Sequence, residues 1–244
     1  MSMGRSGWAT TLACAVLGGG LHAASLSPWV GSGPPLAPAV LQTLALALLL
    51  WAMARQPRSA ALTAWLYGAV WLVGATGWMF VSLHRYGGLP AWLSALAVGL
   101  LCMALAGYLA LLGWAWGRWR TAVWWRDAVL FAGLWLLAEL ARALIFTGFP
   151  WGASGYGLVD SPLRHLAPWL GVYGMGAVWA LLCACAVWGF VAGGAGWRRG
   201  AAVLWIPLAV WALDAAGTRP FTHPQGAPLK VALLQSNVAQ DEKF

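Results

Sequence analysis

Charged side chains are scarce in this 244-residue sequence, where Lys, Arg, Asp and Glu together make up only 8% of the chain. A soluble domain ordinarily carries about 25% charged residues, because it needs polar side chains to cover its surface. Hydrophobic residues instead reach 61%. This composition excludes a water-soluble globule and a disordered chain, and it indicates a polytopic membrane protein.

Acidic residues and cysteines are fewer still. Six Asp and Glu stand against 14 Lys and Arg, which gives a net charge of +8. The basic residues lie singly or in pairs between apolar runs, so they do not form the stripe typical of a nucleic-acid-binding face. The cysteines lie inside apolar stretches, where cysteine behaves as a small hydrophobic residue, and this argues against a disulfide-rich secreted module. They are Cys14, Cys102, Cys183 and Cys185.

Patterns of catalytic and metal-binding residues are also missing from the sequence. We find no Ser or Cys near a His in a polar context, no phosphate-binding glycine loop and no paired catalytic carboxylates. The histidines are scattered and predict no metal site. They are His22, His84, His165 and His223. We therefore expect no catalytic residue, no metal and no cofactor in this chain.

Long apolar stretches are abundant. A bilayer core about 30 Å thick requires around 20 apolar residues per helix, and seven stretches reach or approach that length. Because six more follow the first, we interpret the first as a retained helix rather than a signal peptide. The predicted spans are residues 8–26, 36–54, 60–83, 91–117, 123–146, 169–192 and 200–216.

The basic residues predict an orientation, since cytoplasmic loops carry the excess of Lys and Arg. With a cytoplasmic N-terminus, eight basic residues fall on the cytoplasmic side: Arg5, Arg55, Arg58, Arg118, Arg120, Arg126, Arg198 and Arg199. Five fall on the opposite side: Arg85, Arg164, Arg219, Lys230 and Lys243. We expect a membrane protein with a cytoplasmic N-terminus and a C-terminal tail on the opposite side, in the periplasm or its equivalent.

The C-terminal tail differs from the rest of the chain. A Pro- and Gly-containing segment is followed by a short β-type run at Val231, Leu233 and Leu234. A single strand is not stable alone in water. We predict a transmembrane domain at 1–217, a linker at 218–228 and the beginning of a truncated soluble domain at 229–244.

Two charges lie inside the span 123–146. Glu139 and Arg142 are three residues apart and share one helix face. Charge at membrane depth is costly unless it is paired or faces a wet cavity. Two interpretations stay open: a neutralising pair that fixes helix packing, or a polar patch in a cavity that binds a lipid or its head group. Asp127 and Asp214 lie near span ends and receive no role.

A long loop rich in Gly, Pro and aromatic residues follows this helix. Its aromatic side chains are typical of the membrane interface. Such a loop beside a buried Glu–Arg pair could also clamp a lipid, and the segment 84–90 on the same side could complete the rim. The candidate residues in the loop are Gly148, Phe149, Pro150, Trp151 and Tyr156.

The order of several motifs resembles that of the bacterial apolipoprotein N-acyltransferases. The stretch from Glu139 through Thr147-Gly148-Phe149-Pro150-Trp151 carries the resemblance most clearly. Gly155-Tyr156, Asp160-Ser161-Pro162-Leu163 and Tyr86-Gly87-Gly88-Leu89-Pro90 agree with it. The segment from Val231 to Phe244 resembles the first strand of that family's nitrilase-like domain.

The resemblance implies an inner-membrane enzyme of lipoprotein biosynthesis whose helices hold a carbon–nitrogen-hydrolase domain in the periplasm. A Glu–Lys–Cys triad in that domain transfers an acyl chain from a phospholipid to the N-terminal diacylglyceryl cysteine of an apolipoprotein. The Cys thiolate attacks the phospholipid ester and then leaves from the thioester. The implied partners are these two substrates and the membrane, with no nucleic acid.

The resemblance places that triad downstream of Phe244. Glu242 and Lys243 do not match its positions, and Cys183 and Cys185 lie inside a helix. The predicted fold is therefore an all-α polytopic membrane bundle of about seven helices, followed by the truncated start of an α/β nitrilase-like domain. The lipid-binding candidates are Glu139, Arg142, Gly148, Phe149, Pro150, Trp151 and Tyr156.

Two other functions are consistent with an apolar bundle. A transporter often shows internal repeats, but we find none that relates residues 8–117 to 123–216. A non-catalytic membrane anchor for a soluble partner shares the predicted topology.

Overall fold

The computed structural model describes residues 5–192, 208–210, 212, 215, 222, 225–235 and 238. These residues form helices and connecting turns, and they contain no β-strand. The first half holds α1 (Arg5–Ser25), α2 (Pro28–Gly31), α3 (Ala37–Arg55), η1 (Pro57–Ser59), α4 (Ala60–Thr76), α5 (Trp78–Val81) and the π-helical η2 (Ser82–Tyr86). The second half holds α6 (Ala91–Leu105), α7 (Gly107–Trp119), α8 (Trp124–Leu144), η3 (Ile145–Thr147), η4 (Ser154–Leu158), η5 (Pro162–Leu166) and α9 (Ala167–Ala192).

Five helical stretches among the described residues are long and apolar enough to cross a membrane. They are Ala37–Arg55, Pro57–Thr76, Ala91–Trp119, Trp124–Thr147 and Pro162–Ala192. This confirms the prediction of an all-α membrane bundle. The predicted span 8–26 forms the 21-residue helix α1, whose polar residues and glycines make it less apolar than these five. The predicted span 200–216 lies largely outside the described residues.

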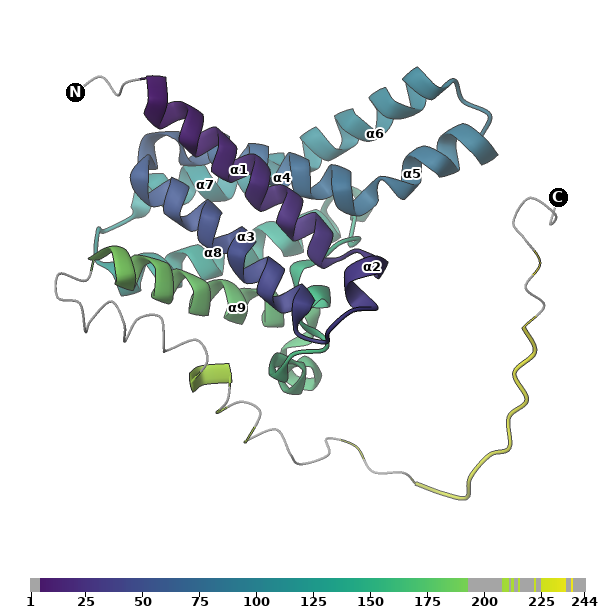
Figure 1. The fold of residues 1–244 in the computed structure, drawn as a ribbon. Helices are drawn as coiled ribbons and strands as arrows, with labels where there is room; N and C mark the ends of the chain where they lie inside the picture. The colour runs from purple at the N-terminus through teal and green to yellow at the C-terminus, as the bar shows by residue number, and fades with distance from the viewer. Residues whose placement is uncertain are drawn as a thin grey trace.

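Two predicted spans are interrupted rather than continuous. The span 60–83 ends as α4 at Thr76 and continues through α5 and η2, while the span 91–117 divides at Ala106 into α6 and α7. Figure 1 shows α5 and α6 as an arm that leaves the remaining bundle. Neither break contains a proline, the residue that most often marks a helix break in a sequence, so both breaks were difficult to predict.

The centre of the bundle is rich in stacked indoles. α1 packs against α3 and α4, and α8 packs against α9 (Figure 1). The rings of Trp71 and Trp135 stack with their centroids 5.8 Å apart, and those of Trp116 and Trp188 lie 4.9 Å apart. A Cβ atom at Gly113 would overlap the backbone of α4, so a glycine there lets two membrane helices approach closely.

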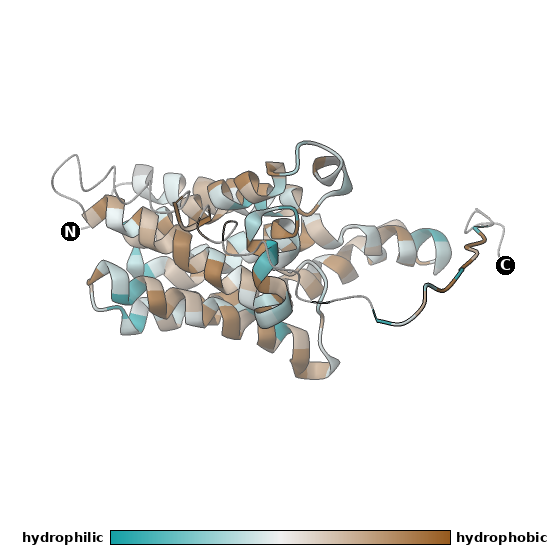
Figure 2. Ribbon diagram, turned by 90° about the horizontal axis from the view of Figure 1, so that it is seen from below, coloured by the Kyte–Doolittle hydropathy of each residue, from teal (hydrophilic) through white to brown (hydrophobic). Residues whose placement is uncertain are grey.

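One end of the bundle gathers most of the exposed basic side chains. Gln56 Nε2 donates to the Gly7 carbonyl at 2.8 Å, and Trp116 Nε1 donates to the Asp127 carbonyl at 3.3 Å, so the start of α1, the end of α3, and the turn between α7 and α8 meet there. The exposed basic residues at this end are Arg55, Arg58, Arg118 and Arg126. Figure 2 shows apolar residues along most of the helices and hydrophilic ones mainly near their ends.

The described part of the C-terminal tail lies outside the bundle. Residues 225–235 form bends and irregular backbone, and the side chains of Leu229, Leu233 and Leu234 are exposed. In Figure 1 this yellow segment lies away from the helices. Within the described residues the predicted β-type run therefore has no strand partner. The domain boundaries 1–217, 218–228 and 229–244 stay predictions.

Candidate functional site

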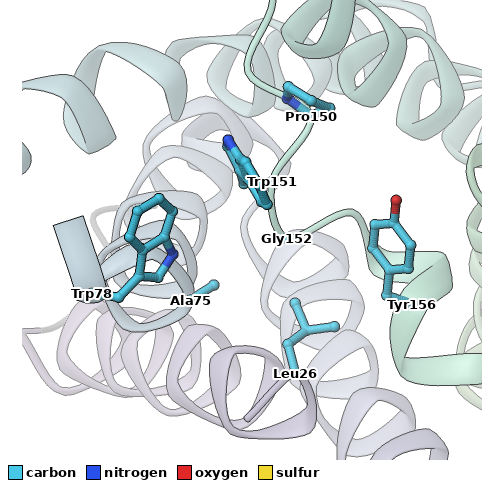
Figure 3. A pocket seen from close by; sticks show the side chains of 7 residues that line it. All are labelled: Leu26, Ala75, Trp78, Pro150, Trp151, Gly152 and Tyr156. Carbon is cyan, nitrogen blue, oxygen red and sulfur yellow. The ribbon is translucent and has the colours of Figure 1, made fainter. Parts of the chain in front are cut away.

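A pocket of about 470 Å³ lies where the loop after α8 meets the end of α1 and the junction of α4 with α5. Figure 3 shows residues from these three segments turned around a common space. The lining residues are Leu26, Ala75, Trp78, Pro150, Trp151, Gly152 and Tyr156. Its side chains are aliphatic or aromatic, and the Tyr156 hydroxyl is the only titratable group among them.

Two indoles form one edge of the pocket. The rings of Trp78 and Trp151 meet edge to face, with centroids 5.6 Å apart and an interplanar angle of 73° (Figure 3). Both indoles remain about half exposed, at 51% and 56%. A tryptophan pair that is half covered and half accessible suits the membrane interface, where an apolar ring meets polar head groups.

Arg142 closes the loop that carries Trp151. Its Nη1 donates to the carbonyls of Phe149 at 2.8 Å and Trp151 at 2.6 Å, and the Phe149 N–H donates back to the Arg142 carbonyl at 2.7 Å. The reversal needs a φ of +82° at Gly148, where a Cβ would also overlap the Ala143 carbonyl. Only glycine adopts that backbone without strain.

Glu139 holds the next part of the same loop. Its carboxylate accepts from the Ser154 N–H at 2.9 Å and from the Ser154 hydroxyl at 2.7 Å. Trp135 Nε1 donates to the same hydroxyl oxygen at 3.2 Å. Glu139 and Arg142 face each other at 3.5 Å and are 1% and 4% exposed. The pair is thus neutralised internally, and each member also binds the loop.

A second group of buried polar side chains reaches the loop from α1, α3 and α4. Gln42 Nε2 lies 2.7 Å from the Ser154 carbonyl and 2.9 Å from His22 Nε2. His22 Nδ1 lies 2.6 Å from the Tyr67 hydroxyl. The His22 ring also stacks on Trp71 at 3.9 Å.

The structure separates the seven predicted candidates into two groups. Pro150, Trp151 and Tyr156 line the pocket. Glu139 and Arg142 lie behind the loop and are buried, while Gly148 and Phe149 shape the backbone between the two groups. The segment 84–90, predicted as part of the rim, does not line this pocket.

Several residues of the site were not selected from the sequence. Leu26, Ala75 and Trp78 line the pocket from elements distant in the chain. Gln42 and Ser154 were also missed. Gln42 is the only amide in the span 36–54. A single amide side chain in an apolar span is a signal that could have identified it.

The geometry is that of a binding site. The pocket can hold an apolar chain, and among its lining residues no nucleophile faces a base. The described residues contain no group of three or more His, Cys, Asp or Glu side chains able to hold a metal ion. Cys183 lies within the hydrophobic core instead.

Comparisons with known proteins agree with the motif order. The family model of the apolipoprotein N-acyltransferase N-terminal domain matches residues 18–186. The apolipoprotein N-acyltransferase of Verminephrobacter eiseniae is 41% identical over 94% of this chain and 45% of its own length. Those of Ralstonia nicotianae and Pseudomonas syringae pv. tomato are 38% and 36% identical, over 84% and 98% of this chain and 39% and 46% of their own lengths.

The chain thus spans less than half the length of these curated relatives. The matched region includes nearly all of α1 to α9, and with them the pocket and the buried polar groups behind it. A family model over most of the chain, together with relatives of this similarity, establishes that the chain belongs to the apolipoprotein N-acyltransferase family.

Proposed function

We propose that this chain is the membrane domain of a phospholipid:apolipoprotein N-acyltransferase. The complete enzyme transfers an acyl chain from a phospholipid to the N-terminal diacylglyceryl cysteine of an apolipoprotein, the last step of lipoprotein maturation. Residues 229–244 begin its nitrilase-like domain, which carries the Glu–Lys–Cys triad implied by the family resemblance. The role of the chain described here is to bind and orient the lipid substrates.

The observation that carries this proposal is the apolar, aromatic-edged pocket beside the 148–156 loop. Its volume of about 470 Å³ falls within the range of roughly 300–1,000 Å³ typical of ligand sites. Trp78 and Trp151 supply a large, rigid apolar surface, and the buried Glu139–Arg142 pair fixes the loop that bears Trp151. A fixed apolar wall favours an acyl chain over a polar solute.

We further propose that the pocket end of the bundle faces the periplasm. Arg55, Arg58, Arg118, Arg120 and Arg126 lie at the opposite end, whereas only Arg85 and Arg164 among the described, unburied arginines lie on the pocket side. By the positive-inside rule the basic end is cytoplasmic. In this arrangement α1 and residues 200–216 also cross the membrane, which makes seven spans and puts the C-terminal tail in the periplasm.

An acylation assay on the complete reading frame that encodes this chain tests the proposal. We expect Trp151→Ala to lower N-acylation of a diacylglyceryl lipoprotein peptide about tenfold, because loss of an aromatic contact worth about 1–2 kcal/mol weakens binding roughly 5- to 30-fold. Trp114→Ala is the matched control. Trp114 is also 56% exposed and also meets another indole edge to face, Trp119 at 5.9 Å, but it lies on α7 outside the pocket.

Equal acylation by the two variants, at equal amounts of protein in the membrane, would contradict the proposal. It would instead favour a bundle that only anchors a soluble domain.

A further inference from the structure

Gln42 lies between the two walls of the pocket without lining it. One wall is the end of α1, where Leu26 directly follows Ser25, and the other is the loop that runs through Gly152 to Ser154. A Cβ atom at Gly157 would come within 3.4 Å of both the Gln42 amide and the Ser25 hydroxyl. The turn η4 therefore approaches α1 and α3 closely at this point.

The hydrogen bonds around Gln42 form one directed chain. The amide nitrogen Nε2 has two hydrogens, which it donates to the Ser154 carbonyl and to His22 Nε2. Because His22 Nε2 then accepts, the ring proton lies on Nδ1 and is donated to the Tyr67 hydroxyl oxygen. With these orientations, every hydrogen bond in the series from Tyr67 on α4, through His22 on α1 and Gln42 on α3, to the loop has one donor and one acceptor.

The surroundings hold this chain in place. His22 and Tyr67 are fully buried, and so is Gln42. The His22 ring stacks on Trp71, which itself stacks on Trp135. Trp135 donates to the Ser154 hydroxyl, so the chain and the Glu139 carboxylate bind the same residue of the loop.

We propose that Gln42, oriented by His22 and Tyr67, sets the separation of the two pocket walls and so determines the affinity for the acyl donor. Gln42 is a positioning residue, since it touches the loop and α1 rather than the pocket. The link to the donor rests on the proposed function, whereas the separation of the walls does not.

A purely stabilising role would have a different signature. Gln42 Oε1 is buried with no hydrogen-bond partner among the described residues. Replacing Gln42 by an apolar side chain leaves the Ser154 carbonyl and His22 Nε2 buried without their donor, which costs about 1–3 kcal/mol of stability. Gln42→Met preserves the packing volume and removes both donors, so the wall separation and the KM, rather than the melting temperature, report the positioning of the loop.

The experiment measures the wall separation and the kinetics of the same variants in the complete enzyme. Spin labels replace Leu26 and Tyr156, on opposite walls, in a separate preparation whose native cysteines, including that of the triad, are changed to alanine, while the kinetics are measured on unlabelled enzyme with its cysteines intact. Pulsed electron–electron double resonance then gives the distance distribution. Thr43→Val is the control, because the Thr43 hydroxyl donates only within its own helix, to the Ala39 carbonyl at 2.6 Å.

For Gln42→Met we expect a broader distance distribution, a modestly lower melting temperature and a KM for the phospholipid donor raised about fivefold, as the loss of its one hydrogen bond to the loop predicts, with kcat nearly unchanged. Tyr67→Phe removes the acceptor at the far end of the chain and should show the same changes to a smaller degree. Thr43→Val should show none of them.

A distance distribution as narrow in Gln42→Met and Tyr67→Phe as in the unmodified protein overturns the proposal. A lower melting temperature and a lower kcat in Gln42→Met, with KM unchanged, also overturn the proposal, since that pattern belongs to a purely structural residue. If the distribution broadens but the unmodified enzyme acylates no lipoprotein, the positioning role stands and the proposed function fails.

Discussion

Single polar residues at membrane depth decide how the pocket is built. Glu139 and Arg142 form an ion pair, yet each makes its shortest contacts with the loop, to Ser154 and to the carbonyls of Phe149 and Trp151. Their charges are therefore neutralised by each other while their hydrogen bonds fix the backbone in front of them. The pair thus neutralises its own charge within the membrane-spanning helix and also fixes the backbone of the loop beside the pocket.

Glu139→Ala should destabilise the protein by about 3–5 kcal/mol, because it leaves Arg142 as a buried charge without its partner and removes the acceptor of the Ser154 N–H. SDS-induced unfolding of the reconstituted chain, followed by tryptophan fluorescence, measures this change. Asp160→Ala is the control: Asp160 is an exposed carboxylate in the same loop, and its loss should stay within about 0.5 kcal/mol. Equal stabilities of the two variants would show that the buried pair contributes no more to the free energy of unfolding than an exposed carboxylate does.

Some of these residues could be predicted from the sequence and others could not. Glu139, Arg142 and the Gly148 to Trp151 stretch could be predicted because charge inside an apolar span and a Gly–Pro turn are visible locally. Trp78 could not be assigned to the pocket, because its place there depends on how α5 leaves the bundle. Asp127 received no role from the sequence; in the structure it lies in the first turn of α8, is buried, and accepts hydrogen bonds from the Thr121 and Ala122 N–H groups.

At the scale of elements, close approach between α9 and the loop is what presses Ser154 against Glu139. Gly176 on α9 faces Ser154, and a Cβ there would overlap the Ser154 hydroxyl and come within 3.1 Å of Glu139 Oε2. Small residues at such contacts let membrane helices pack closely. The apolar pattern predicted the existence of α9, but it carried no information on which glycine meets the loop.

Gly176→Ala should therefore push Ser154 away from Glu139, lower stability by about 1–3 kcal/mol as overpacking does, and reduce acylation in the complete enzyme. Gly99→Ala on α6 provides the comparison, because no atom lies within 4 Å of its added Cβ. That change should be neutral or stabilise by up to about 1 kcal/mol, from helix propensity alone. Unfolding curves of both variants measure the difference, and a stabilising Gly176→Ala would contradict this contact.

For the whole molecule, composition predicted the membrane bundle and the order of motifs predicted the family. Five of the predicted spans coincide with helices long and apolar enough to cross a membrane. The arm of α5 and α6 was not predicted, since helix breaks without proline arise from packing between distant segments. The pocket depends on that arm, so it too required the three-dimensional structure.

The proposed orientation can be tested by labelling single cysteines from outside the cell. A membrane-impermeant maleimide should label Arg164→Cys in intact cells with a permeabilised outer membrane, and Arg118→Cys only after lysis. Both side chains are exposed, and they lie on opposite sides in the proposed topology. The reverse pattern would place the pocket in the cytoplasm and remove the basis for periplasmic acylation.

In the proposed function the pocket holds a phospholipid acyl chain. The most direct test of this binding is photocrosslinking of this chain, in nanodiscs, with phosphatidylethanolamine that carries a diazirine at the end of one acyl chain. Peptide mapping should find more label at Trp78, Trp151 and Tyr156 than on the exposed side of α7 around Trp114. Unlabelled phospholipid should lower the pocket labelling at least as much as the labelling of α7. A label spread evenly over every lipid-facing helix, with no excess at the pocket, would mean that the pocket holds no acyl chain.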